Sequence, residues 1–452
     1  MKRVALTTFG CKANQFDTAV IESLLRKEPV EIVDFSDEAD FYVINSCSIT
    51  AEADREARQF VRRAHKKNPS AQIIVTGCSA QVDPGAFEKM GIVRHVVGNE
   101  AKRRVVELIA RSPLLCTVKQ YPEGKEGLGE VEKRRANALP HPASPYKGEE
   151  VFYETPDTYS KNSRAFLKIQ DGCSQFCSFC IVPFARGLNR SVSPDKVLES
   201  MHKLGRKGFN EIVLTGIHLG TYGHDLRPKT SLYNLMRRIE SERPSPRVRI
   251  SSVDPEELSH EMIDLIAASD IFCHHLHLPL QSGNDGILKK MRRRYTASHF
   301  TVLTERLINR IPDLCLGTDL IVGFPGEGEE EFRASLRLLD ESPVHYIHTF
   351  PYSDRKGTKA SAFADKVEPS VIRSHAGQIR GLSDQKRGAF YRNFIGRTLE
   401  AVVESRRGDR PVGLTRNYIS VEIEGECRYS PGNLAMVRVD STSQDGAKGV
   451  LA

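Results

Sequence analysis

The sequence lacks any long run of apolar residues. None approaches the length of about 20 residues that crossing a bilayer requires. The opening Met1-Lys2-Arg3 leads into a strand-like segment, Val4–Thr8, where a signal peptide would have its apolar core. These two absences argue against a membrane protein and against a secreted one. We therefore expect a cytoplasmic protein with no membrane partner.

A strong excess of charge of one sign is also missing. Lysine and arginine number 65 and aspartate and glutamate 58, which leaves a formal net charge of +7 over 452 residues. This excess suits a polyanionic partner but is too small to identify one. Hydrophobic residues make up 39% and charged residues 27%, as in globular domains. The length predicts about three domains.

The first half of the chain predicts an α/β domain followed by a linker. Residues 1–112 alternate between strand-like and helical segments, with strands expected at Val4–Thr8, Phe41–Asn45 and Gln72–Thr76. This alternation predicts a small parallel sheet. Residues 113–160 are rich in proline, glycine and charge without sustained periodicity, which predicts a linker.

The second half predicts two barrels. Residues 161–390 hold six strand-like runs separated by helical segments, which predicts a partial parallel (β/α)6 barrel with its chemistry at the C-terminal ends of the strands. The runs are Phe166–Ile169, Ile212–Thr215, Val248–Ser251, His275–Leu278, Gly317–Val322 and Tyr346–Phe350. Residues 393–452 hold short strands and turns, with strands expected at Thr398–Val403, Tyr418–Ile423 and Ala435–Val439. They predict a small antiparallel β-barrel that forms a separate module.

Three cysteines stand together just after the first expected barrel strand. Cys173, Cys177 and Cys180 follow the spacing C-x3-C-x2-C, and the cytosol would keep such thiols reduced. Three thiolates can hold three irons of a [4Fe–4S] cluster and leave the fourth open, free to chelate S-adenosylmethionine and pass an electron into its S–C bond. The loop resembles the signature of the radical S-adenosylmethionine superfamily. The alternatives are a zinc knuckle with an outside ligand, or thiols that only pack.

A second cysteine triplet is spread over the first domain. Cys11, Cys47 and Cys78 each come just past an expected strand, about one strand–helix–strand unit apart. Right-handed crossovers would bring all three thiols to the same carboxyl edge of the sheet. We favour a second cluster with three protein ligands over the alternative of buried packing residues. The remaining cysteines are expected to pack; they are Cys116, Cys273, Cys315 and Cys427.

With both triplets the chain resembles the methylthiotransferase family over essentially its whole length. The family has a cluster domain, a radical barrel and an RNA-binding barrel known as the TRAM domain, in this order. The motif Gly10-Cys11-Lys12-Ala13-Asn14-Gln15 is similar to the Gly-Cys-Lys-Val-Asn-Gln of the branch that acts on threonylcarbamoyladenosine in tRNA. Ala13 departs from that pattern. Further stretches similar to this branch are Thr50–Arg55, Leu214–Gly220 and Met291–Thr296.

The resemblance implies a reaction. It is the methylthiolation of carbon 2 of N6-threonylcarbamoyladenosine 37 in tRNA, with S-adenosylmethionine and two [4Fe–4S] clusters as cofactors. The resemblance makes Cys11, Cys47 and Cys78 ligands of an auxiliary cluster, and Cys173, Cys177 and Cys180 ligands of the radical cluster. Alternatives are isopentenyladenosine 37, an aspartate of a ribosomal protein, or a non-catalytic iron–sulfur carrier.

Contacts with S-adenosylmethionine are expected at the ends of the barrel strands. Gly216, Ser252 and Gln281 end the second, third and fourth expected strands, and Ile321 lies on the strand where the superfamily contacts adenine. Turn formation is the alternative role for these residues.

The resemblance also implies partners, namely a tRNA anticodon stem-loop, an external electron donor and a sulfur source. Lys12 and the Arg292–Arg294 run are candidates for recognising the anionic threonylcarbamoyl group. Phosphate contacts are expected from Arg380, Lys386, Arg387, Arg392, Arg397, Arg406, Arg407 and Arg410. Stacking on bases is the hypothesis for Phe390, Tyr391, Phe394 and Tyr418, with core packing as the favoured alternative.

Overall fold

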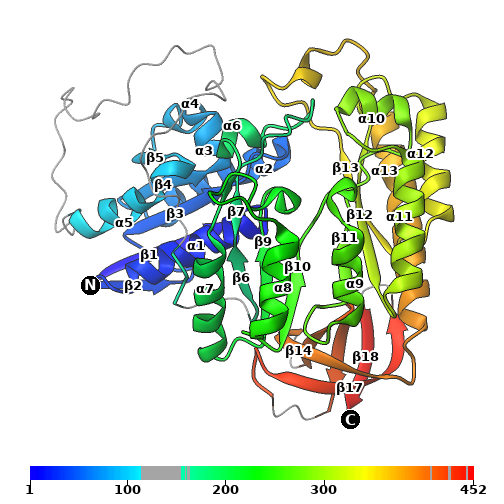
Figure 1. Cartoon of the computed structure of the whole chain (residues 1–452). Helices are drawn as coiled ribbons and strands as arrows, with labels where there is room; N and C mark the ends of the chain where they lie inside the picture. Colours follow the sequence, from blue (N-terminus) through cyan, green and yellow to red (C-terminus); the bar gives the residue numbers. More distant parts are fainter. Residues whose placement is uncertain (113–153, 158, 160–162, 408–409, 426–428, 444–445) are drawn as a thin grey trace. The chain divides into compact units, whose positions relative to one another are not determined.

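The computed structural model describes residues 1–112, 154–157, 159, 163–407, 410–425, 429–443 and 446–452, shown in Figure 1. The chain forms two compact units. The first comprises Met1–Thr158, Ile181–Gly187 and Arg355–Gly357, and the second comprises Tyr159–Cys180, Leu188–Asp354 and Thr358–Ala452. The predicted linker, residues 113–160, lies almost entirely outside the described residues, as do Cys116 and Cys427.

The first unit is built on a five-stranded parallel sheet. Its order is β2-β1-β3-β4-β5, and every pairing is parallel. The central strands β1 (Lys2–Thr8), β3 (Phe41–Ser46) and β4 (Gln72–Gly77) are the three expected ones. The edge strands β2 (Val30–Val33) and β5 (His95–Val97) are additional. They escape prediction because such short edge segments carry little hydrophobic periodicity.

Helices cover this sheet. They are α1 (Lys12–Leu25), α2 (Ala51–Lys67), α3 (Cys78–Val82), α4 (Pro84–Glu88), the 3₁₀ turn η1 (Asn99–Ala101), α5 (Lys102–Arg111) and α6 (Val182–Arg186). The side chain of Thr50 caps α2 by accepting a hydrogen bond from the backbone of Ala53 at 3.2 Å. One core cluster packs alternate residues of β3 and β4, such as Tyr42, Ile44 and Ile73, against α2. The rigid sheet thus holds its carboxyl edge in place.

The second unit contains the six expected barrel strands, all parallel. They form two sheets, β10-β9-β6 and β11-β12-β13, joined by a parallel bridge between Val248 and Phe272. Their bounds are β6 (Ala165–Lys168), β9 (Glu211–Thr215), β10 (Arg247–Ile250), β11 (His275–His277), β12 (Cys315–Val322) and β13 (Tyr346–Pro351). The partial-barrel prediction is therefore confirmed.

Helices alternate with these strands and surround them (Figure 1). The main ones are α7 (Pro194–Arg206), α8 (Leu232–Glu242), α9 (His260–Ala268), α10 (Asp285–Met291), α11 (Ala297–Arg310), α12 (Glu329–Glu341) and α13 (Pro369–Arg392). Shorter elements are β7 (Gln170–Asp171), β8 (Arg190–Ser191) and the 3₁₀ turns η2 (Leu219–Thr221), η3 (Pro255–Glu257) and η4 (Lys359–Ala362). Among the described residues, no helix is both long enough and apolar enough to span a bilayer.

The C-terminal residues close into a five-stranded barrel, as expected. Its order is β14-β15-β16-β18-β17, with β14 (Thr398–Arg407), β15 (Arg410–Thr415), β16 (Ser420–Glu424), β17 (Leu434–Ser443) and β18 (Gly446–Leu451). Four pairings are antiparallel, but β16 and β18 pair in parallel. The barrel is therefore not antiparallel throughout. A closed ring of five strands cannot alternate direction at every neighbour, so one parallel pair is unavoidable.

Packing is continuous between the two barrels of the second unit. Tyr346 of β13 and Phe390 of α13 share a core cluster with Val421 and Val437 of the C-terminal barrel. Arg249 of β10 is also fully buried. Its guanidinium donates to Glu211 at 2.8 and 3.1 Å and to the Thr415 carbonyl of the C-terminal barrel at 3.0 Å. The C-terminal barrel thus shares a core with the radical barrel, and the predicted boundary at residues 390–393 stays a prediction.

Candidate functional site

The first cysteine triplet lies at one edge of the parallel sheet. Cys11 caps α1 directly after β1, Cys47 follows β3, and Cys78 begins α3 after β4. Because β1, β3 and β4 are adjacent and parallel, the three residues follow the same carboxyl edge. Burial, together with the charges of Cys78 and Cys11, raises the pKa of Cys47 to about 12. The structure thus brings the three cysteines to one edge of the sheet, and their role as cluster ligands stays a prediction.

Two glycines let the backbone close around these thiols. Gly10 has φ +88°, and a Cβ added there would lie 2.5 Å from the Cys47 sulfur. Gly77 has φ +97°, and its Cβ would lie 2.3 Å from the Ser46 carbonyl oxygen. Both positions need a residue without a side chain. The glycines of Gly10-Cys11 and Gly77-Cys78 are thus what brings the cysteine-bearing loops together.

Asn14 links two of the cysteine-bearing loops through hydrogen bonds. Its buried amide donates to the Phe9 carbonyl at 2.8 Å and to the Ser46 carbonyl at 3.0 Å. Asn45 donates in turn to the Asn14 carbonyl and to Thr18 Oγ1, both at 2.9 Å. Asn14 was noticed in the sequence only as part of the branch motif. Its position between two cysteine loops gives it a structural role there.

The second triplet occupies the loop that follows β6 and β7. Gly172 and Phe176 both have positive φ, of 71° and 51°, and the backbone of Cys180 donates to the Cys177 carbonyl at 3.0 Å. Burial raises the pKa of Cys177, and the charge of Cys173 acts in the same direction. The loop therefore curls its thiols towards one another.

Buried Gln170 joins this loop to the loop after β9. Its amide nitrogen donates to the Gly172 carbonyl at 2.7 Å, and its oxygen accepts from the backbones of Ile217 at 2.9 Å and His218 at 2.8 Å. A Cβ at Gly216 would lie 2.9 Å from the same Gln170 oxygen and 2.8 Å from the Leu219 side chain. The expected cofactor residue Gly216 thus lies next to the cysteine loop.

The other expected cofactor residues also lie at strand ends. Ser252 is half-buried in the segment after β10. Gln281 has φ +66°, donates its backbone N–H to Asp319 at 2.8 Å and accepts from Ile321 at 3.0 Å. Ile321 is buried in a cluster against which Phe179 of the cysteine loop packs. Contact of any of the four with a cofactor stays a prediction.

Sequence reasoning missed a charged network beside the radical loop. His218 lies 3.6 Å from the Cys173 sulfur through Nδ1, and its Nε2 faces Glu257 at 2.8 Å and Asp254 at 3.3 Å. Burial opposes its charge, but the hydrogen bonds to Asp254, Cys173 and Glu257 raise the pKa of His218 to about 12. Arg293 donates to the Cys177 sulfur at 3.4 Å. No spacing signal links these residues, because they come from three separate loops.

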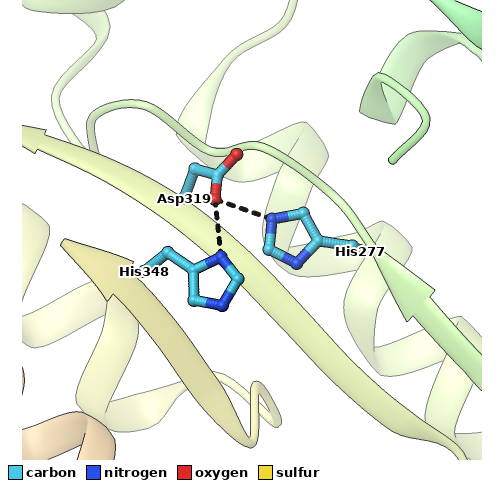
Figure 2. A group of neighbouring side chains, drawn as sticks. All are labelled: His277, Asp319 and His348. Carbon is cyan, nitrogen blue, oxygen red and sulfur yellow. Dashed lines mark hydrogen bonds and ion pairs between the residues drawn. The ribbon is translucent and has the colours of Figure 1, made fainter. Parts of the chain in front are cut away.

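A second polar group lies on neighbouring strands β11, β12 and β13. Figure 2 shows His277 and His348 both directed at one oxygen of Asp319, at 2.7 and 3.3 Å. Burial raises the pKa of the Asp319 carboxyl, but the charge and hydrogen bond of His277 together hold it well below its usual range. His277 Nδ1 also lies 3.1 Å from the Tyr346 hydroxyl. The group is therefore held by hydrogen bonds within the barrel wall.

The residues expected to bind RNA fall into two classes. Phe390, Tyr391 and Phe394 are buried in the core shared by the two barrels, which supports core packing over stacking. Tyr418 is half-buried and stacks on His275, with ring centroids 4.0 Å apart.

The basic residues that are expected to contact phosphate differ in the partners they have in the structure. Arg397 pairs with Asp313, Arg387 with Asp384 and Arg410 with Glu422, while Lys386 donates to two backbone carbonyls. Arg380 and Arg392 are exposed on α13. The side chains of Arg406 and Arg407 lie outside the described part of the chain.

Known proteins match both units. A model of uncharacterized protein family UPF0004 matches residues 3–98, and a model of the radical SAM superfamily matches residues 167–339. The threonylcarbamoyladenosine tRNA methylthiotransferase MtaB of Bacillus subtilis is 36% identical over 94% of this chain and 91% of its own. The chain belongs to the methylthiotransferase family of radical S-adenosylmethionine enzymes. An Aquifex aeolicus protein of the same name, also 36% identical, covers 94% of this chain and 97% of its own.

Other relatives define the neighbouring branch and the fold. A tRNA-2-methylthio-N(6)-dimethylallyladenosine synthase of Clostridium botulinum is 30% identical over 96% of this chain and 93% of its own. The solved structure of the radical S-adenosylmethionine methyltransferase TsrM from Kitasatospora setae matches with a TM-score of 0.53 at 16% identity. That match covers 80% of this chain and 77% of TsrM and supports the fold. The relatives confirm the family and the threonylcarbamoyladenosine branch inferred from the motifs.

Membership of this family implies S-adenosylmethionine and [4Fe–4S] clusters as cofactors. The residues present fit this requirement, because three cysteines follow adjacent strands at one edge of the sheet and three others share one loop, and iron binds cysteine as the thiolate. The other two described cysteines, Cys273 and Cys315, are buried in the barrel, as expected. Three thiols of one triplet would leave one iron of a [4Fe–4S] cluster without a cysteine.

Proposed function

We propose that this chain converts N6-threonylcarbamoyladenosine 37 of tRNA to its 2-methylthio derivative. The proposal is supported above all by the relatives named threonylcarbamoyladenosine tRNA methylthiotransferase, each 36% identical over 94% of the chain. The branch motif that begins at Gly10-Cys11-Lys12 points the same way. Carbon 2 of adenine carries a C–H bond too weakly acidic for an ordinary base, so its replacement needs a radical.

In this proposal each cysteine triplet holds a different cluster. Cys173, Cys177 and Cys180 would hold the radical cluster, and Cys11, Cys47 and Cys78 the auxiliary cluster. When bound, the clusters and S-adenosylmethionine supply one-electron cleavage of an S–C bond and a methylated sulfur for transfer. The protein's part is to hold the thiols in place.

The chain's own side chains orient the cofactor region. Gln170 holds the cysteine loop and the loop of Gly216 at a constant separation through three hydrogen bonds. Gly216, Ser252, Gln281 and Ile321 would contact S-adenosylmethionine from four successive strand ends. Because the positive φ of Gln281 turns the chain back to pair with β12, that end of the site is rigid.

The tRNA anticodon stem-loop is the macromolecular partner in this proposal, and an external electron donor and a sulfur source complete the reaction in the cytoplasm. Arg373, Arg380 and Arg387 are spaced seven residues apart on α13, which puts them on one face of that helix. Arg373 and Arg380 are exposed. This face suits phosphate contacts.

A comparison of substrates tests the proposal. Reconstituted enzyme is incubated with S-adenosylmethionine and a reductant, and with one of two anticodon stem-loops, threonylcarbamoylated or dimethylallylated at adenosine 37. Mass spectrometry should find a mass gain equal to a methylthio group on the threonylcarbamoylated RNA. Preferential reaction of the dimethylallylated RNA, favoured by the Clostridium botulinum relative, would replace this function. Reaction of a ribosomal protein alone would overturn it.

A further inference from the structure

Two buried side chains face the sulfurs of the radical-cluster cysteines. His218 Nδ1 lies 3.6 Å from Cys173 Sγ, and an Arg293 terminal nitrogen donates to Cys177 Sγ at 3.4 Å. The side chains of His218 and Arg293 are only 9% and 4% exposed. They come from different segments, since His218 follows β9 and Arg293 follows α10. Each side chain thus reaches a different cysteine of the same loop.

One carboxylate contacts both side chains. Asp254, after β10, places Oδ2 3.3 Å from His218 Nε2 and Oδ1 2.6 Å from the second terminal nitrogen of Arg293. Glu257 adds a contact of 2.8 Å to His218 Nε2. Gly220 makes room for it, because a Cβ there would overlap the Glu257 carboxylate. The remaining imidazole nitrogen of His218 therefore faces the sulfur.

Arg293 makes a further contact through its Nε atom. Its Nε donates to the Tyr295 hydroxyl at 3.1 Å, and that hydroxyl is fixed by the Pro279 carbonyl at 2.6 Å. The guanidinium is therefore fixed in position by Tyr295 and Asp254. The nitrogen that donates to Cys177 Sγ cannot turn away without breaking two other bonds.

From this geometry we infer that Asp254, through His218 and Arg293, raises the reduction potential of the radical cluster. This inference rests on the proposed function, since it requires the cluster on Cys173, Cys177 and Cys180. Hydrogen bonds to ligand sulfurs and nearby positive charge both favour the reduced cluster, which carries one more negative charge. The carboxylates of Asp254 and Glu257 contact the nitrogens of His218 and Arg293 that do not face the sulfurs. The sulfurs therefore face the remaining nitrogens of these side chains, and Arg293 carries a positive charge.

Burial makes the effect large enough to measure. A charge within a few ångströms of a cluster acts through a medium of low dielectric constant when its side chain is withdrawn from water. Salt screens such buried charges much less than exposed ones. Removal of one cation also leaves Asp254 without one partner, which adds negative charge close to the cluster. Both changes disfavour reduction.

The test measures the midpoint potential of the radical cluster. Full-length protein with Cys11, Cys47 and Cys78 all replaced by alanine leaves one cluster, which dithionite reduces by one electron in an EPR-monitored titration. In this background Arg293→Gln removes a positive charge, and His218→Gln removes the imidazole whose Nδ1 faces Cys173 Sγ. We expect each to lower the equilibrium constant for reduction at least tenfold, a shift of about 59 mV to more negative potential for a one-electron couple.

Arg294→Gln is the matched control. It removes the same charge from the adjacent residue, whose side chain is exposed, and should leave the potential unchanged. Iron and sulfide content of every variant shows whether the cluster is present, so two independent variants keep the test open if one loses its cluster. Cluster-bearing Arg293→Gln or His218→Gln protein with the wild-type potential overturns the inference.

The control variant provides a second result that could contradict the inference. An equal shift in Arg294→Gln would show that overall charge, and not the contacts with sulfur, sets the potential, and this also overturns the inference. If reconstituted protein with its native cysteines shows no [4Fe–4S] signal, the proposed function has failed instead. Cleavage of S-adenosylmethionine by the Gln variants should slow in proportion to the fraction of cluster that the reductant keeps reduced.

Discussion

Gly10 and Cys47 are in such close contact that a β-carbon at residue 10 would lie 2.5 Å from the Cys47 sulfur. The two residues follow β1 and β3, which are adjacent and parallel in the sheet of the first unit, and each lies in a loop that bears a ligand of the proposed auxiliary cluster. At this approach of the two loops, only glycine fits at residue 10.

The first prediction concerns this contact. Gly10→Ala should displace Cys47 and lower the iron content by about half, as expected if the two clusters have separate ligand sets. Methylthiolated product should disappear, while reductive cleavage of S-adenosylmethionine persists. Gly91→Ala is the control, because Gly91 also has a positive φ, of 69°, but a Cβ there meets nothing within 4 Å. Both variants bear a backbone strain of about 1 kcal/mol. Equal iron in both would show that the contact is unimportant.

The second prediction compares cysteines in the second unit. Cys173→Ala, Cys177→Ala and Cys180→Ala should each abolish formation of 5′-deoxyadenosine, because two thiolates do not keep a [4Fe–4S] site intact. Cys315→Ala removes a buried thiol that lies in the core shared with the C-terminal barrel. It should retain the iron and the cleavage activity. Cleavage at the wild-type rate by a triplet variant, measured by chromatography of the nucleoside, would contradict the radical assignment.

The third prediction concerns the C-terminal barrel. The sequence predicts that residues 393–452 form a separate module, and removal of such a module would leave the radical chemistry intact. In the structure this truncation takes away the Thr415 and Leu414 carbonyls that accept from Arg249 and Arg247, both fully buried. It also uncovers apolar residues of the shared core, such as Tyr346 and Phe390, which destabilises the remaining barrel and favours aggregation. We expect the truncated protein to be insoluble or to lack a cooperative thermal transition, as followed by calorimetry. A stable truncated barrel would show that the shared core is dispensable.

The fourth prediction concerns the exposed face of α13. The double variant Arg373→Ala with Arg380→Ala should weaken binding of the anticodon stem-loop and reduce the slope of log K against log salt by about 1.4 to 1.8, the value for two phosphate contacts. Arg206→Ala, an exposed residue at the end of α7, should change neither. Fluorescence anisotropy at several salt concentrations gives both quantities. An unchanged slope in the double variant would remove this face from the proposed interface.

The fifth prediction is a pH dependence of stability. Burial raises the pKa of Glu327 to about 7, and the charge of Glu331 adds to this, although the Gly323 backbone donates to its carboxylate at 2.6 Å. The Nδ1 atom of His375 lies 3.9 Å from the Oε1 atom of Glu327. Because the folded pKa exceeds the unfolded one, the folded state binds more protons. The stability of the folded state therefore falls as pH rises from about 4.5 to about 7.

The conservative variant tests this. Glu327→Gln keeps an oxygen that can accept from Gly323 and cannot ionise, so it should be more stable than wild type at pH 8, by up to about 3 kcal/mol. The difference should shrink towards pH 5. Urea unfolding at several pH values measures it. A constant difference over this range would show that Glu327 does not titrate on unfolding.

Several features could be predicted because they depend on local patterns. Alternating strands and helices predict parallel sheets, and right-handed crossovers of short length place the residues after β1, β3 and β4 at one edge. For this reason the position of Cys11, Cys47 and Cys78 at one edge of the sheet could be predicted from the sequence. The spacing of Cys173, Cys177 and Cys180 needed no tertiary information, because a single loop carries all three residues.

The charged network around the radical loop was not predictable in this way. Asp254 meets His218 and Arg293 only after three barrel strands have paired and their loops have converged, and no spacing in the chain encodes that meeting. Similarly, Phe390 and Phe394 read as aromatics interleaved with basic residues, and their burial depends on the C-terminal barrel that packs over them.

The sequence by itself therefore determined the family and the parallel strands of both units, and it predicts the six cysteine ligands, since these depend on residue types at short and regular spacings. The tertiary structure alone decided which charges surround the thiols, which arginines are buried, and that the two barrels of the second unit share one core. Long-range contacts between loops set these properties, and the free energy of a buried charge depends on the partners that folding brings to it.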